Sequence, residues 1–499
     1  MNLYGVMKHM QMKIKSIEIK NYKAFYGKHT INLGGKNVFI YGENGSGKSS
    51  LYYALKDFFQ SSIETIDMAE VDNIFLKASD KGKNYIKVKF QPNKDGQRRV
   101  AEYELTAIGK TTNAAGDTSI RDANKLKSFL TYKHLLDIHH IKKDGEIDLF
   151  NLLVKGVLKH FKYTLTGGKE LGELWSEIET IIAKETGTSY RSDQKKKDVD
   201  NALKAFNDAF KQLFIKPTTG LPNPEYILGH AAPILEEFEH GLEIDLRYTQ
   251  ATTDDYKNIK QNHVRADLKF CGQTIPKAHL FLNEARLSAI AISIYLGMIK
   301  RHPQLKPHKI LFLDDIFIGL DISNRLPLLK ILDVHFPEYQ VFITTYDKPW
   351  YEYVRGFLSD KWKTIEFYAQ EVKGGFEIPK IEDGTDLVQK ARQHYSNSDY
   401  KASAVYARSS FEKIIMDYCE RKRKPIAFKA KRKDYSSQDF WNKVKGDVLP
   451  ATKISIEGYR FLIYNKLSHY DPEVNPLKTE LRDAITAVEN LRTELNAIP

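Results

Sequence analysis

Residues 42–49, which read GENGSGKS, constrain this chain more than any other part of its sequence. They match the pattern G-x-x-x-x-G-K-[ST], a loop whose glycines let backbone N–H groups close around phosphate oxygens. The apolar run at 37–41 before the loop is typical of a buried strand, and residues 51–59 after it have the pattern of an amphipathic helix. Strand, loop and helix in this order predict the phosphate site of an α/β nucleotide-binding domain.

The polar positions of this loop have expected roles in binding a nucleoside triphosphate. Lys48 would place a positive charge at the β- and γ-phosphates, and Ser49 would offer a hydroxyl to Mg²⁺. The helix that begins near Ser50 would direct the positive end of its dipole at the phosphates. The expected ligands are ATP and Mg²⁺, and the expected cradle comprises Gly42, Asn44, Gly45, Gly47, Lys48, Ser49 and Ser50.

A second candidate part of the site lies far along the chain from Ser49, where the apolar residues 310–313 run into two aspartates. Asp314 would hold Mg²⁺ through water. Asp315 would polarise the attacking water, since a carboxylate can act as the base in phosphoryl transfer. The long separation predicts an insertion between two halves of one nucleotide-binding domain.

Composition narrows the class of protein and its surroundings. A chain of 499 residues favours about two to four domains, and its net charge of +12 favours anionic partners such as nucleic acid. Cys271 and Cys419 lie far apart, which argues against a disulfide framework or a cysteine zinc site and suits a reducing cytoplasm. No run of about 18 apolar residues occurs, so we expect a cytoplasmic protein without a membrane span.

Hydrophobic periodicity predicts the elements on either side of the insertion. A surface loop is expected at 109–125, where Gly, Thr, Asn and Asp are frequent, and a turn at 92–96 would join two strands as a hairpin. A long helix at 281–300 precedes the carboxylate strand. The predicted strands are 14–19, 30–33, 85–90, 99–105, 309–313 and 340–344.

The intervening segment has a mostly helical pattern. Helices at 198–214 and 225–242 stand on either side of the proline-rich turn 221–224, which predicts a short antiparallel hairpin. The expected domains are an N-terminal lobe at 1–150, a helical insertion at 151–265, a C-terminal lobe at 266–383 and a helical assembly or partner domain at 384–499.

Four further stretches stand where the SMC/RecF/OLD branch of the ABC ATPases carries its motifs, and the chain resembles that branch over residues 12–370. The stretches are IEIKNYKAF at 17–25, LNEAR at 282–286, GLD at 319–321 and ITTYD at 343–347. The resemblance implies an α/β fold: a split ABC head with a mixed sheet, a short helical hairpin insertion and a C-terminal α-helical domain. It also implies hydrolysis of ATP to ADP and phosphate.

The same resemblance assigns roles to individual residues. Asn283 and Glu284 would belong to the signature segment and Asp321 to the D-loop, all three as nucleotide contacts, while Tyr346 would take the catalytic position of the switch histidine. In this branch the signature segment of one subunit covers the nucleotide of another, which implies homo-oligomers that form through the ATPase heads. Residues 129–133 are the candidate for the Q-loop, although its glutamine is not evident.

Four residues depart from the pattern of the branch. Asn283 replaces a serine and Ala285 a glycine of the signature, Asp315 replaces a glutamate, and Tyr346 replaces a histidine. Asp315 has a shorter carboxylate, and Tyr346 is no proton carrier at neutral pH. We therefore expect slow hydrolysis at a firm ATP-binding site.

The short insert, these motifs and the helical tail together resemble the ATPase component of PARIS-type anti-phage systems, with the Septu ATPase as a close alternative. This implies a sensor or scaffold that holds or releases a partner nuclease of the TOPRIM or HNH type, with a phage protein as candidate trigger. Two alternatives stay open: a RecF- or SMC-like DNA-maintenance ATPase that binds DNA directly, and a non-hydrolysing scaffold locked by nucleotide. Arms of about 20 residues, or about 30 Å, are too short for the DNA bridging of SMC proteins.

The tail carries a basic stretch and no pattern of a nuclease. Most residues from Arg421 to Lys433 are basic, which suits contact with DNA or with an acidic partner protein. HEPN ribonucleases carry R-x4–6-H, but Arg460 and His469 are too far apart in the sequence to match this pattern. We therefore expect that this chain does not cut nucleic acid by itself.

Overall fold

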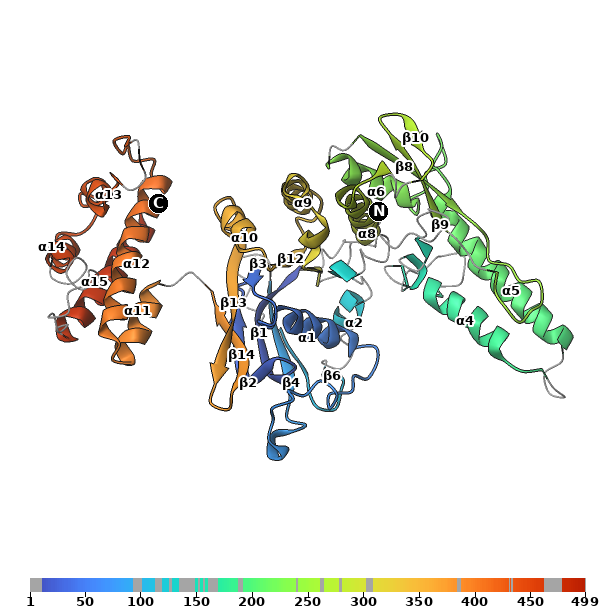
Figure 1. Ribbon diagram of the computed structural model, residues 1–499, viewed down its shortest axis with the longest axis horizontal. Coiled ribbons are helices and arrows are strands. Elements are labelled where there is room, and N and C mark those ends of the chain that lie inside the picture. The colour runs from blue at the N-terminus through green and yellow to red at the C-terminus, as the bar shows by residue number, and fades with distance from the viewer. Residues whose placement is uncertain are drawn as a thin grey trace, which may run out of the picture. The chain divides into compact units, whose positions relative to one another are not determined.

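The structure is a computed structural model that describes residues 11–92, 101–112, 119–124, 128–133, 149–150, 153–155, 158–159, 169–186, 192–238, 241–260, 264–277, 281–301, 308–383, 387–429, 431, 434–461 and 478–498. The chain divides into two compact units, Met1–Glu382 and Asp383–Pro499. All strands that the structure describes lie in the first unit, and the regular elements described in the second are helices (Figure 1).

A six-stranded sheet with the order β14-β13-β3-β12-β11-β7 forms the centre of the first unit. Its strands are Phe376–Glu382 (β14), Trp362–Val372 (β13), Asn37–Gly42 (β3), Gln340–Thr345 (β12), Ile310–Asp314 (β11) and Phe129–Thr131 (β7). The strands from β13 to β7 are parallel, and β14 pairs antiparallel with β13. This confirms the α/β class with a mixed sheet.

Both faces of this sheet are buried. Val38 and Ile40 of β3 face one core, whereas Phe39 and Tyr41 face the other, as expected for alternating side chains on a strand. A parallel sheet that is covered on both faces needs apolar residues at nearly every position. The continuous apolar runs at 37–41 and 310–313 follow from this double burial.

An antiparallel sheet with the order β2-β1-β4-β5-β6 covers one face, together with α1 (Lys48–Gln60). Its strands are Met12–Tyr22 (β1), Phe25–Asn32 (β2), Tyr85–Pro92 (β4), Ala101–Leu105 (β5) and Thr111–Thr112 (β6). The predicted pairing of β4 with β5 is confirmed, whereas the turn predicted between them extends beyond the described residues.

Helices cover the other face of the six-stranded sheet. They are α8 (Glu284–Arg301), α9 (Ile322–His335), α10 (Lys348–Arg355) and α6 (Ile227–Glu236), and their buried residues belong to one core. That core continues into the insertion through Trp175, Phe206 and Phe210. The insertion is therefore packed as part of the first unit.

The predicted pairing within the insertion is wrong. The two long helices that run side by side are α4 (Leu171–Ala183) and α5 (Ser192–Lys211), while α6 packs against α8 (Figure 1). The reason is a close approach at Gly297 of α8, where a Cβ atom would lie 2.8 Å from the backbone of Ala231 in α6. Only a glycine allows this contact, so α6 is held by the head and is not free to pair with α5.

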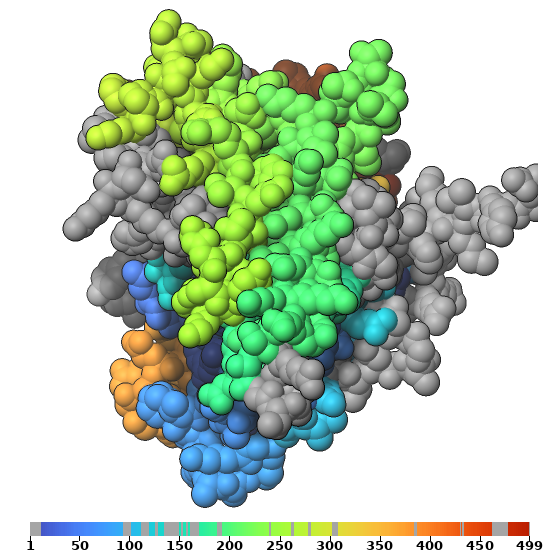
Figure 2. Space-filling model, turned by 90° about the vertical axis from the view of Figure 1, so that its right-hand side faces the viewer, coloured from blue at the N-terminus to red at the C-terminus, as the bar shows by residue number. Residues whose placement is uncertain are grey.

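The insertion also contains strands that the helical prediction missed. Leu242–Tyr248 (β8), Val264–Phe270 (β9) and Gln273–Ile275 (β10) form an antiparallel sheet with the order β10-β9-β8. Side chains of α5 and of this sheet cover the upper part of the face in Figure 2. The loop predicted at 109–125 contains β6 and a short helix, α2 (Ser119–Asn124), because Ile120 is fully buried against α1 and the antiparallel sheet.

The second unit is helical, as its sequence pattern predicted, and it has a hydrophobic core of its own. It is built from α11 (Leu387–Ser396), α12 (Tyr400–Arg421), α13 (Ser437–Val444), α14 (Pro450–Tyr459) and α15 (Lys478–Ala497). Trp441 is fully buried among Phe411, Ile415 and Leu481 of the same core. Among the helices described in either unit, none is long and apolar enough to cross a membrane.

Gln340 joins the two sheets of the first unit and provides a test of their packing. Its buried amide accepts a hydrogen bond from the Ile14 N–H (2.6 Å) and donates to the carbonyls of Ile14 (3.1 Å) and Lys36 (2.8 Å). Gln340→Leu should lower the free energy of unfolding by about 2 kcal/mol, because it removes the acceptor of the buried Ile14 N–H, whereas the Ile14 carbonyl keeps its bond from the Gly35 N–H. Urea denaturation of the full chain measures this loss. Gln370→Leu, at an exposed position of β13, is the matched control, and equal losses in both variants would contradict the role of Gln340.

Candidate nucleotide-binding site

The loop at 42–49 leaves the carboxyl end of β3 and enters α1. Gly45 and Gly47 have φ angles of 84° and 98°, a region that disfavours any side chain. A Cβ atom on Gly42 would lie 2.4 Å from Ser46 Oγ, and one on Gly47 would lie 2.6 Å from Pro379 Cγ of β14. The glycines are therefore required by conformation and by space, and the strand, loop and helix lie in the predicted order.

Lys48, the first residue of α1, is almost fully buried beneath the loop. Its Nζ donates to the carbonyls of Gly42 (2.6 Å) and Glu43 (3.1 Å), and it lies 4.0 Å from Asp315 Oδ2. Burial lowers the pKa of Lys48, while the charges of Asp315 and Asp314 oppose that change. The ammonium is thus stabilised by carbonyls and carboxylates at the position where the loop would receive phosphates.

The structure brings Asp314 to the same place from the end of β11. Ser49 Oγ donates to Asp314 Oδ2 (3.3 Å), and Thr344 Oγ1 donates to Asp314 Oδ1 (2.7 Å). Burial raises the pKa of Asp314, and these two hydrogen bonds oppose the change. Ser49 belongs to α1 and Thr344 to β12, so hydrogen bonds from two elements orient the Asp314 carboxylate.

Asp315 follows directly and adopts a left-handed conformation with φ 51°. Its N–H donates to Thr344 Oγ1 (2.9 Å), which fixes the turn, while its Oδ1 is buried without a hydrogen-bond partner among the described residues. Burial raises the pKa of Asp315 to about 6, against the opposing charge of Lys48 and with the added repulsion of Asp314. A carboxylate with this pKa can accept a proton near neutral pH.

The other predicted site residues lie at the starts of neighbouring helices. Asn283 is exposed and accepts a hydrogen bond from the Arg286 N–H (3.0 Å), so it caps α8, which begins at Glu284. Asp321 caps α9 by accepting from the Asn324 N–H (3.1 Å). Tyr346 is 46 % exposed and follows the end of β12. The structure thus brings together Lys48, Ser49, Asp314 and Asp315, and holds Asn283, Glu284, Asp321 and Tyr346 at adjacent loops and helix starts of the same unit.

One residue beside the aspartates was missed by sequence reasoning. Thr344 donates to Asp314 and accepts from the Asp315 N–H, and its only signal was a hydroxyl in the stretch ITTYD. The candidate Q-loop 129–133 lies next to Asp314: Thr131 pairs with Asp314 across β7 and β11, and Lys133 opposes the rise in the pKa of Asp314.

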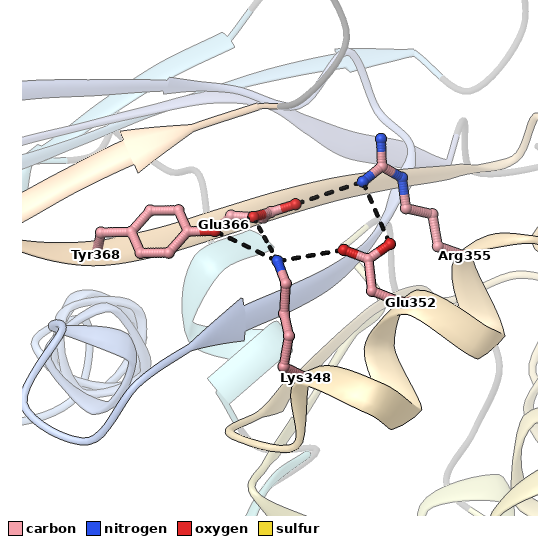
Figure 3. A network of polar contacts seen from close by, with 5 residues as sticks. All are labelled: Lys348, Glu352, Arg355, Glu366 and Tyr368. Atoms are coloured by element: carbon pink, nitrogen blue, oxygen red, sulfur yellow. Dashed lines mark hydrogen bonds and ion pairs between the residues drawn. The ribbon is translucent and has the colours of Figure 1, made fainter.

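A polar network secures the helix that follows Tyr346. Lys348 of α10 lies 2.7 Å from Glu366 Oε2 and 3.2 Å from Glu352 Oε1, and it donates to Tyr368 Oη at 3.3 Å (Figure 3). Arg355 completes the network with Glu352 and Glu366. Partial burial lowers the pKa of Lys348, but the three hydrogen bonds outweigh it and raise that pKa above its ordinary value. The network fastens α10 to β13, next to β3 and its loop.

The residues of the loop fit ATP with Mg²⁺. Ser46 Oγ, like Asp315 Oδ1, is buried without a described partner, and both belong to the phosphate end of the site. The described residues contain no group of three or more His, Cys, Asp or Glu that would form a metal cage by itself. Mg²⁺ bound with a nucleotide needs only one or two protein ligands, which Ser49 and Asp314 can supply.

Comparison with known proteins identifies a family that matches this chain. The model of the RecF/RecN/SMC N-terminal domain matches residues 13–367, and no curated protein matches the chain. Among solved structures, the Smc head bound to the C-winged helix domain of ScpA is 14% identical with a TM-score of 0.40, covering 76% of this chain and 99% of its own.

Two further head structures are similar to this chain. A Smc head with an extended coiled coil, bound to the C-terminal domain of ScpA from Pyrococcus furiosus, is 12% identical with a TM-score of 0.42, covering 78% of this chain and 100% of its own. The SMC head from Thermotoga maritima is 15% identical with a TM-score of 0.35, covering 75% and 100%. Because the family model spans well over half of the sequence and includes both halves of the site, this chain belongs to the RecF/RecN/SMC N-terminal domain family of ABC-type ATPases.

Proposed function

We propose that this protein is an ATP-binding, slowly hydrolysing ATPase that acts as sensor and scaffold of an anti-phage defence complex and holds or releases a partner nuclease. The observation that carries the ATPase part is the cluster of buried Lys48, Asp314 and Asp315, with the exposed Ser49 beside them bonded to Asp314. The defence part is supported by the short insertion, because α4 has 13 residues and α5 has 20. At 1.5 Å per residue these arms extend only about 20–30 Å, which suits contact with a partner protein better than DNA bridging.

The chain's own residues would divide the work as follows. Lys48 and the loop N–H groups bind and orient the phosphates of the substrate ATP, and Ser49 and, through water, Asp314 would hold Mg²⁺. Mg²⁺, when bound, would neutralise charge on the phosphates. Asp315 accepts the proton of the attacking water, while Thr344 orients the Asp314 carboxylate and holds the backbone of Asp315. The short carboxylate at Asp315 and the phenol at Tyr346 account for slow turnover.

Two variants, one expected to lose ATP binding and the other expected to lose hydrolysis alone, test the ATPase assignment. Lys48→Ala should abolish binding of ATP, whereas Asp315→Asn should retain binding within about threefold and lower kcat at least about 100-fold, since it removes only the base. ATP binding and phosphate release measure the two effects. Lys77→Ala, at an exposed position, is the control. Equal phosphate release in all variants would rule out the enzyme, and oligomers that persist without turnover would favour the non-hydrolysing scaffold.

The pKa of Asp315 predicts the pH dependence of hydrolysis. The base must be ionised, so kcat/KM, measured with Mg²⁺ in excess, should fall about tenfold per pH unit below about pH 6. The residual kcat/KM of Asp315→Asn should not show this fall below about pH 6. An unchanged rate down to pH 5 in the wild-type protein would show that another group is the base.

A phage challenge tests the defence role. Cells that express this protein together with the product of its neighbouring gene should form fewer phage plaques than cells with the empty vector, by about tenfold or more, and Lys48→Ala should remove the protection because nucleotide no longer binds. A TOPRIM or HNH nuclease beside the gene should co-purify with the wild-type protein. A recombination operon and unprotected cells would instead favour a DNA-maintenance ATPase.

A further inference from the structure

Arg325 of α9 connects two loops of the site that are well separated in the sequence, at Asp321 and at Tyr346. Its Nε donates to the carbonyl of Leu320 (2.8 Å), directly before Asp321. Its Nη1 donates to Asp347 Oδ2 (2.7 Å), directly after Tyr346. One planar guanidinium therefore joins both loops, which a single ammonium could not do with the same geometry.

The surroundings of this guanidinium keep it in place. The side chain of Arg325 is only 13% exposed, and its guanidinium lies 5.9 Å from the ring of Phe317 and 5.6 Å from that of Trp350. Phe317 comes from the 3₁₀ helix η5 (Ile316–Gly319) and Trp350 from α10. Burial tends to raise the pKa of Asp347, but hydrogen bonds from Arg325 and the Trp350 N–H lower it overall, so the carboxylate is charged at neutral pH.

The segments that Arg325 joins are those that carry the reacting groups. Asp315 begins the turn into η5 and Leu320, and Thr344 leads through β12 to Tyr346 and Asp347. The bond from the Asp315 N–H to Thr344 Oγ1 ties the two segments at their start, and Arg325 ties them at their end. With both ties present, η5 and the left-handed turn at Asp315 form a closed loop of defined geometry.

The far side of α10 is fastened independently. Lys348 and Arg355 bind Glu366 of β13 (Figure 3), so α10 is a fixed support. Arg325 therefore connects the end of η5 to the start of α10, a helix whose position is fixed by separate contacts with β13. The binding of Lys48 to the carbonyls of its own loop does not involve any of these contacts.

We propose that Arg325 is a positioning residue that couples the Asp321 loop to the Tyr346 loop and thereby sets the place of Asp315. The inference rests on the proposed ATPase function, and it concerns turnover and not nucleotide binding. A shift of about 1 Å in a catalytic group can cost about 100-fold in rate. Loss of the coupling should therefore lower kcat and leave KM for ATP nearly unchanged.

Steady-state hydrolysis by the full-length protein tests whether kcat falls while KM stays nearly unchanged. Arg325→Gln should lower kcat at least about tenfold with KM within about twofold of the wild type. Arg325→Lys should not restore kcat, because one ammonium replaces the fork that contacts both loops. Lys330→Gln is the matched control: it removes an exposed cation of the same helix, whose ion pair is with Glu237 and not with η5 or α10. Asp347→Asn removes the same link from the other side and should act like Arg325→Gln if that variant fails to fold.

Amide hydrogen exchange gives a second readout that needs no turnover. Arg325→Gln and Asp347→Asn should speed exchange in the peptides 316–321 and 344–350, whereas Lys330→Gln should leave both unchanged. If exchange rises in one loop only, or kcat of Arg325→Gln matches that of Lys330→Gln or recovers in Arg325→Lys, the coupling is wrong. If the wild-type protein shows no hydrolysis above Asp315→Asn, the proposed function fails, and the exchange experiment alone decides the link between the loops.

Discussion

The burial of Lys48 between the carbonyls of its own loop and the carboxylates of Asp314 and Asp315 is the constraint on which the rest of the first unit depends. A charge in a protein interior costs several kcal/mol unless partners of opposite charge surround it. Those partners come from a strand that is distant in the sequence, and the parallel strands β3, β12 and β11 bring them to the edge of the sheet where Lys48 lies. The doubly covered sheet places all three charged groups in a buried position.

Two cores follow from that sheet, and they have different consequences for function. The core shared with α1 and the antiparallel sheet supports the phosphate loop, and Gln340 connects its two sheets. The other core includes α8, α6 and the insertion without a break. Because α6 packs on α8 at Gly297, the helix that starts at Glu284 and the insertion form one packed body.

The residues that depart from the family pattern can be compared with the contacts that surround them. The loop itself retains every group that phosphate binding requires, and Asp314 and Asp315 are oriented by Thr344. Asn283 and Asp321 cap α8 and α9, which stabilises the first turns of these helices. These features agree with our proposal of a nucleotide-binding switch whose turnover depends on how the neighbouring loops are held.

The sequence by itself determined the local features of this protein. The strand, loop and helix around residues 42–49, the aspartates at the end of a buried strand and the helical tail follow from residue spacing and from the glycines at 45 and 47, because these depend on backbone geometry within a few residues. The tertiary structure alone decided the partner of α6, the strands β8–β10, the burial of α2 and the roles of Thr344 and Arg325. Apart from the tight hairpin of β9 with β10 and the Arg325–Leu320 hydrogen bond, these depend on contacts between residues distant in the chain, whose strength comes from burial that no local pattern records.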